Sequence, residues 1–92
     1  MSNESTNEDT LLEFPCTFSV KSMGLANTGF DQVVVEIVRR HAPDLGEGAV
    51  TTRNSKGEKY VSVTVTLTAQ SKAQLDAIYQ DLTNCEQVIM SL

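Results

Sequence analysis

The chain has 92 residues, enough for one small domain with a modest stability margin, and its formal net charge is −5. Glu4, Glu8 and Asp9 supply −3 of that charge within the first ten residues, which leaves −2 on the rest of the chain. The chain after residue 10 is therefore close to neutral. This argues against binding to nucleic acid or to an anionic membrane surface through bulk charge.

The N-terminal segment, residues 1–10, contains a single apolar residue and is rich in Asn, Ser and Thr. With nothing to bury, it is expected to be a disordered acidic tail, followed by one folded domain over residues 11–92. It lacks the basic flank and apolar run of a signal peptide, and no window of the chain resembles a membrane-spanning helix. We therefore expect a soluble cytoplasmic protein.

A strand over residues 16–23 is the first predicted element, because apolar side chains alternate there with Thr, Ser and Lys. Gly24 is expected to end this strand. A helix follows, in which Thr28 and Asp31 are spaced like a capping box, and Pro43 is expected to stop it. Its apolar stripe consists of Phe30, Val33, Val34, Ile37, Val38 and His41.

Residues 44–53 predict a loop followed by a short strand over residues 49–53, and residues 54–58 have turn chemistry. The next ten residues, Tyr60–Ala69, alternate without a break between apolar and polar side chains. Val63 belongs to the apolar set and Thr64 to the polar set. Such a pattern of β-branched residues is typical of a strand with one buried face and one polar face.

Ser71 is expected to begin a second helix, with Gln74 completing a capping box and Asn84 ending the helix. Its buried face is predicted to be Leu75, Ile78, Tyr79 and Leu82. Alternation over residues 88–92 predicts a last strand.

The element order βαββαβ with right-handed crossovers predicts an α+β, ferredoxin-like sandwich: a four-stranded antiparallel sheet, order 4-1-3-2, with two helices on one face. The third strand is then central. Cys16 and Cys85 lack CxxC spacing and would lie at opposite ends of neighbouring strands, roughly 20 Å apart at about 3.3 Å per residue. A disulfide needs Cα atoms within about 7 Å, so two free thiols are expected.

Catalytic and metal-binding patterns are weak, and neither an enzyme nor a cofactor is expected. The single histidine, His41, falls in the last helical turn, where a cation complements the helix dipole, and no cluster of metal ligands accompanies it. No Ser or Cys has an adjacent base. Residues 56–63 superficially follow an RNA-recognition pattern, but Glu58 stands where a base-stacking aromatic is needed, so RNA binding is not expected.

Two surfaces are candidate sites. Lys21, Arg53, Lys56 and Lys59, four of the seven basic residues, lie on predicted strands or their hairpin, and with Tyr60 they could contact an acidic protein partner through the open sheet face. Solvated charge is the simpler interpretation. The second candidate is the loop before the first helix, where helix N–H groups could bind a small ligand; its residues are Gly24, Asn27, Thr28 and Gly29. An ordinary turn and cap explains the same glycines.

Five short motifs occur in a characteristic order: LLEFP (11–15), KxMG (21–24), HAP (41–43), SKG (55–57) and YxSV (60–63). Together they resemble the YbeD-like family of small bacterial proteins, from about residue 11 to residue 92. The resemblance implies a ferredoxin-like fold related to ACT regulatory domains, no established biochemical activity, and a link to lipoate metabolism, because members are often encoded near lipoate-attachment genes. The chain departs from the family in a longer acidic tail and one extra residue between Gly57 and Tyr60. The ACT-type D-x-x-G loop is absent.

Two functions follow as hypotheses. The first is a non-enzymatic regulatory or protein-interaction module, monomeric or weakly dimeric, that works through its open sheet face or an edge strand. The alternative is an ACT-like domain that binds a small ligand with the loop before the first helix.

Overall fold

The structure, a computed structural model, describes residues 13–92, except for the side chain of Glu47, so the predicted tail over residues 1–10 lies outside the described residues. The elements in chain order are β1 (Cys16–Leu25), α2 (Phe30–His41), the 3-10 turn η1 (Glu47–Ala49), β2 (Val50–Asn54), β3 (Tyr60–Ala69), α3 (Lys72–Thr83) and β4 (Met90–Ser91). They form the predicted α+β arrangement.

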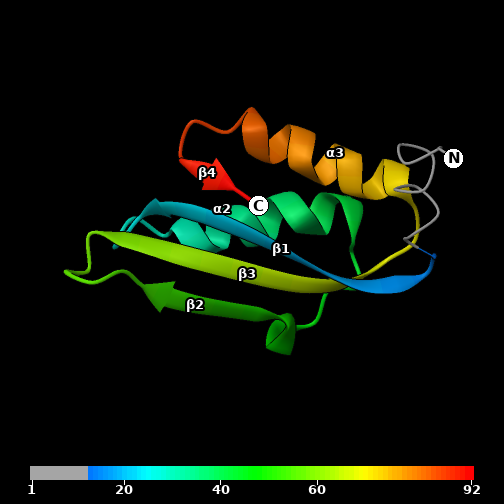
Figure 1. Ribbon diagram of the computed structural model, residues 1–92, viewed down its shortest axis with the longest axis horizontal. Coiled ribbons are helices and arrows are strands. Elements are labelled where there is room, and N and C mark those ends of the chain that lie inside the picture. The colour runs from blue at the N-terminus through cyan, green and yellow to red at the C-terminus, as the bar shows by residue number, and fades with distance from the viewer. Residues whose placement is uncertain (1–12) are drawn as a thin grey trace, which may run out of the picture.

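The sheet has the order β2-β3-β1-β4 with antiparallel neighbours, which is the predicted order counted from the other edge. Both helices cover one face of it and leave the other face open (Figure 1). β1 and β3 pair along their full length, whereas β2 and β4 pair only with the half nearest the β2–β3 hairpin. The sheet is therefore four strands wide at one end and two strands wide at the other.

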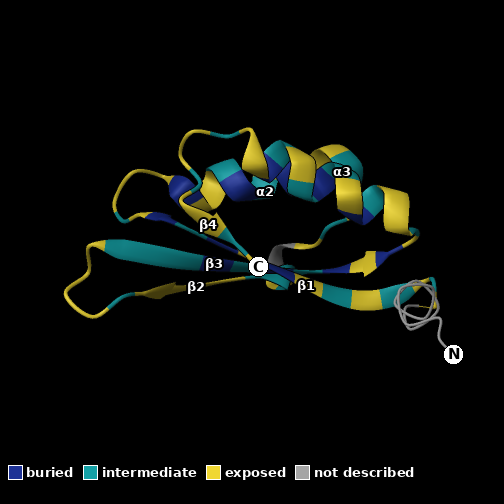
Figure 2. Cartoon of the chain, turned by 45° about the horizontal axis from the view of Figure 1, so that its top comes forward, coloured by how far each residue is buried: buried dark blue, intermediate teal, exposed yellow. Residues whose placement is uncertain are grey.

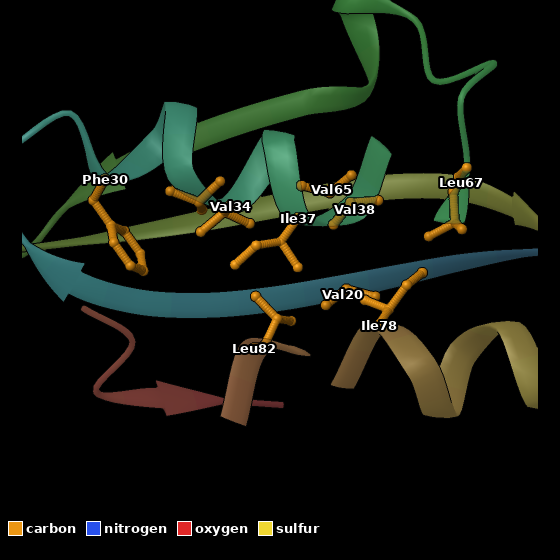
Figure 3. Packing of buried hydrophobic residues seen from close by; sticks show 11 residues of the cluster. Val20, Phe30, Val34, Ile37, Val38, Val65, Leu67, Ile78 and Leu82 are labelled. Atoms are coloured by element: carbon orange, nitrogen blue, oxygen red, sulfur yellow. The ribbon is translucent and has the colours of Figure 1, made fainter. Parts of the chain in front are cut away.

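The core lies between the sheet and the helices, where the alternation predicted for β3 is confirmed. Val63 and Val65 of β3 are fully buried, as is Val20 of β1, and they pack against both helices (Figure 3). On each strand and helix, the buried residues lie on the side that faces the other layer (Figure 2). The helices contribute Phe30, Val34, Ile37, Val38, Leu75, Ile78 and Leu82 to the buried set.

The prediction that Gly24 ends the first strand is wrong. β1 continues to Leu25, and Gly24 is a buried strand residue. A Cβ atom at this position would lie 2.5 Å from Cδ1 of Phe30, so the glycine leaves the space that the phenyl ring fills. The packing of α2 on β1, rather than a turn, accounts for this glycine.

The predicted capping box of the first helix is also wrong. Gly29 is the N-cap of α2, with a left-handed φ of 73° and no side-chain cap bond. The Thr28 hydroxyl instead donates backward to the Leu25 carbonyl at 2.8 Å, which closes the turn between strand and helix. The second helix start is confirmed, because the Gln74 N–H donates to the hydroxyl of the N-cap Ser71 at 3.1 Å. The reciprocal bond of the predicted capping box is shifted by one residue, since the Gln74 side chain accepts from the Gln70 N–H at 2.7 Å instead of from the Ser71 N–H.

Two strands start later than predicted because turns replace their first residues. β2 begins one residue late, since Ala49 belongs to η1, and β4 is only Met90–Ser91, since backbone bonds fold the segment after α3 into turns. Asn84 caps α3 as expected. Cys16 and Cys85 are both free, which confirms the prediction.

Candidate functional site

The open sheet face is defined by the strand registers, because directly opposed residues of antiparallel strands point to the same side. Arg53 of β2 lies opposite Ser62 of β3, which lies opposite Met23 of β1, which lies opposite Met90 of β4. The face consists of Thr17, Ser19, Lys21, Met23, Leu25, Thr51, Arg53, Tyr60, Ser62, Thr64, Thr66, Thr68, Met90 and, paired with Lys21 through the backbone, Leu92. None of these residues is Asp or Glu.

Two of the predicted basic residues, Lys21 and Arg53, come together on this face. They line a shallow hollow of about 370 Å³ whose floor includes Ser62 and Thr64. Both side chains are exposed, and within residues 13–92 neither forms an ion pair. The hollow therefore presents positive charge that no carboxylate of the described chain neutralises.

The other predicted contact residues lie at the hairpin end of the face. The ammonium group of Lys59 stands 5.5 Å from the centroid of the Tyr60 ring, a cation–π distance that holds a positive charge beside the aromatic face. Lys56 is exposed in the turn that the Glu58 N–H closes onto the Ser55 carbonyl, and it does not line the hollow. The structure thus brings together four of the five residues in two pairs and leaves Lys56 at the tip.

Sequence reasoning missed an apolar strip beside these cations, formed by Met23, Leu25, Met90 and Leu92. Leu25, Met90 and Leu92 are 49%, 51% and 69% exposed, which is unusual for large apolar side chains. Met23, Met90 and Leu92 line a second small hollow together with Lys21. The alternation over residues 88–92 was visible in the sequence, but its facing depends on how β4 pairs with β1, far away in the chain.

The loop of the second candidate site forms a tight turn. Asn27 has a left-handed φ of 63°, Thr28 bonds back to Leu25, and Gly29 accepts the first N–H bonds of α2 from Gln32 and Val33. Gly24, the fourth predicted residue, faces the Phe30 ring. The turn and its packing therefore explain the conformation and position of each of these residues.

His41 makes a contact that no sequence pattern predicts. Its Nε2 atom lies 2.7 Å from Oδ2 of Asp81, and its carbonyl accepts a 2.7 Å bond from the Gln74 side chain, so two bonds join the end of α2 to α3. Arg40 lies 3.9 Å from the same carboxylate. In the part of the chain that the structure describes, no three His, Cys, Asp or Glu side chains gather as a metal site would require. The contact between His41 and Asp81 thus links α2 to α3.

None of the helices within residues 13–92 has both the length and the apolar character needed to cross a membrane.

A family model described as "Protein of unknown function (DUF493)" matches residues 9–92. A UPF0250 protein of Chromobacterium violaceum is 46% identical over 88 residues, which cover 96% of this chain and 99% of that protein. A UPF0250 protein of Neisseria gonorrhoeae is 45% identical over 85 residues, covering 92% and 93%. The solution structure of protein HP0495 from H. pylori superposes with a TM-score of 0.66 at 14% identity, covering 88% of this chain and 85% of that one, and shares the fold.

Proposed function

Because the chain belongs to the family of proteins of unknown function DUF493, a YbeD-like family, we propose its role from geometry: a non-enzymatic module that binds an acidic protein partner through the open sheet face. One observation carries the proposal. Lys21 and Arg53 share a hollow on a face whose described residues include no Asp or Glu, and the apolar strip lies directly beside them.

The two parts of this face would supply different terms of a binding free energy. The cations steer an acidic partner and set its orientation, because complementary potentials raise the association rate more than the affinity. The apolar strip supplies the burial: covering Leu25, Met90 and Leu92 contributes roughly 1 kcal/mol each, since each is already partly covered. The flexible Met23 and Met90 side chains adapt to the partner's shape.

The distribution of acids supports an acidic partner although the whole chain is negative. Asp31 and Glu36 lie on α2, Asp76 and Asp81 lie on α3, and the open-face residues of the four strands include none. Arg39, Arg40 and Lys72 lie on the same helices and leave the helical side close to neutral, so the net attraction for an acidic protein is on the sheet side. The charge pattern selects one orientation.

Photo-crosslinking in cells tests the proposal. A benzoylphenylalanine at Thr51, exposed beside the hollow, is expected to capture a protein that the same group at Gln80, exposed on α3, does not. The charge reversal Lys21→Glu should abolish the capture while leaving the melting temperature within a few degrees. Equal capture from both positions, or capture that ignores Lys21→Glu, would contradict an open-face partner.

A second proposal keeps the loop before α2 as a small-ligand site of the ACT-like kind. Gly29 caps α2 through its backbone alone, with no side-chain hydrogen bond at the cap. Titration with amino acids and lipoate-related acids tests it: chemical-shift changes confined to residues 24–31 would support the loop. The link to lipoate metabolism that the family resemblance implies belongs to both proposals and depends on the identity of the partner or ligand.

A further inference from the structure

The long strand β1 has an open edge. It pairs with β3 over all ten residues, but on its other side β4 meets only Ser22 and Met23, with Leu92 opposite Lys21. Figure 1 shows the N-terminal half of β1 continuing past β4 and the end of the chain. Among residues 13–92, this half of the strand is therefore paired on one side only.

The unpaired backbone groups are those of Thr17 and Ser19. Lys21 exchanges N–H to carbonyl bonds of 3.3 and 2.8 Å with Leu92, whereas Ala26 donates to Lys59 of the β3 side. Because backbone groups alternate in direction along a strand, the odd-numbered residues of β1 face the β4 side. Thr17 and Ser19 thus direct two N–H and two carbonyl groups outward, without a partner among residues 13–92.

This edge differs from the outer edge of β2 in what surrounds it. On β2, Thr51, Thr52, Arg53 and Asn54 are all exposed, so a strand added there would bury little apolar surface. Beside the β1 edge, Phe18 is half-buried against the core and Leu92 is 69% exposed. Apolar side chains together with open backbone groups favour strand addition at β1.

Tyr79 of α3 marks the inner wall of the open edge. Its hydroxyl donates to the Leu92 carbonyl at 2.8 Å, where the β4 ladder ends, and its ring packs half-buried against the core. A strand that continued the line of β4 beyond Leu92 would begin beside this hydroxyl group. The site therefore takes an extended segment with an apolar residue on its inner side.

We propose that the occupant is the same edge of a second copy, so that two chains pair antiparallel through Thr17 and Ser19 into one continuous sheet. The segment has the required pattern, with Phe18 on the inner side and Thr17 and Ser19 on the outer side. Thr17 of each copy lies opposite Ser19 of the other, which forms four backbone bonds about a two-fold axis.

The neighbouring residues limit the pairing to this short segment. Pro15 has no N–H to donate, and Leu92 already occupies the position opposite Lys21. Residues 16–20 carry no charge, so the two-fold axis brings no like charges together. So few bonds give a weak dimer that forms at high protein concentration. The inference is independent of the open-face proposal, because it uses the sheet edge.

Sedimentation equilibrium over a series from micromolar to millimolar protein tests the pairing. The wild type is expected to approach twice the monomer mass at the upper end. Ser19→Pro removes the outward N–H but no bond to β3, and should stay monomeric. Ser19→Ala keeps the N–H while losing the 3.1 Å hydroxyl contact with Thr66, and should associate like wild type. Thr52→Pro, on the outward side of β2, is the matched edge control and should also associate.

Hydrogen exchange can be measured on the wild-type protein alone, so the result does not depend on whether a variant folds. The Thr17 and Ser19 amides should exchange at least about tenfold more slowly at millimolar than at micromolar concentration. Protection at all concentrations in a chain that sediments as a monomer would mean that a segment of the same chain occupies the edge, and no protection at any concentration would mean that the edge stays open. Either result overturns the proposal, as does a dimer lost in Thr52→Pro but kept in Ser19→Pro.

Discussion

Replacing Gly24 by alanine tests how β1 and α2 pack. The added Cβ would lie 2.5, 2.6 and 2.7 Å from three atoms of the Phe30 ring, closer than any van der Waals contact allows. Gly24 is a strand residue without a left-handed φ, so alanine strains nothing in the backbone itself. The expected loss is that of overpacking a core, about 1–3 kcal/mol, reduced by the roughly 0.5–1 kcal/mol that alanine gains over glycine within a strand.

We therefore expect Gly24→Ala to lower the free energy of unfolding by about 1–2 kcal/mol, measured by urea denaturation followed by circular dichroism. Gly48→Ala is the matched control, because nothing lies within 4 Å of its added Cβ. Phe30→Leu removes the ring atoms at the contact, and the double variant should lose at least about 1 kcal/mol less than the two single losses combined. The packing argument would be refuted if Gly24→Ala left the free energy of unfolding unchanged, or if the losses of the two single variants were strictly additive in the double variant. Gly24 would then be better explained as the end of the strand.

Four further outcomes are expected. Val63→Ala should cost on the order of 1–3 kcal/mol because the side chain is fully buried, whereas Thr64→Ala on the open face should cost under about 1 kcal/mol; equal losses in urea denaturation would mean that both faces are covered. Ser71→Ala should cost about 1 kcal/mol through the lost cap of α3, and Ser71→Asp should retain most of it. Burial raises the pKa of Tyr79 above its ordinary value of 10.0, so the unfolded chain releases this proton first and stability falls as pH rises through that region; Tyr79→Phe should show a smaller fall between about pH 9 and about pH 11. Deleting residues 1–10 should change the free energy of unfolding by less than about 0.5 kcal/mol, and a clear drop in melting temperature would contradict the predicted tail.

The sequence predicts those helices and strands whose pattern of residues lies within a single short segment. The alternation of Tyr60–Ala69 determines a strand with one buried face whatever its neighbours are, and Ser71 with Gln74 specifies a helix start through bonds three residues apart. Pro43 stops α2 because it restricts the residue before it. From these local rules the order βαββαβ, and with it the sheet order, follows by handedness.

The candidate surface was predictable only in part, for the same reason. Lys21 could be placed on the open face, because its strand alternates clearly, whereas the short strand of Arg53 shows no alternation, and only the pairing of Arg53 with Ser62 places it on the same face. The apolar strip could not, because Met90 meets Met23 across a two-residue strand whose register no local pattern specifies. The contact between His41 and Asp81 likewise joins residues forty positions apart.

Gly24 shows most clearly where local reasoning ends. A glycine after an alternating run is a sound turn signal, and here the strand passes through it, because the Phe30 ring of α2 needs the space of a missing side chain. The open edge of β1 has the same origin: its residues specify a strand, while the number of neighbours along it depends on how far β4 reaches. The sequence alone determined which segments are strands and helices, through interactions spanning a few residues. The tertiary structure decided which side chains and edges remain unpaired, because that depends on the packing of segments distant in the chain.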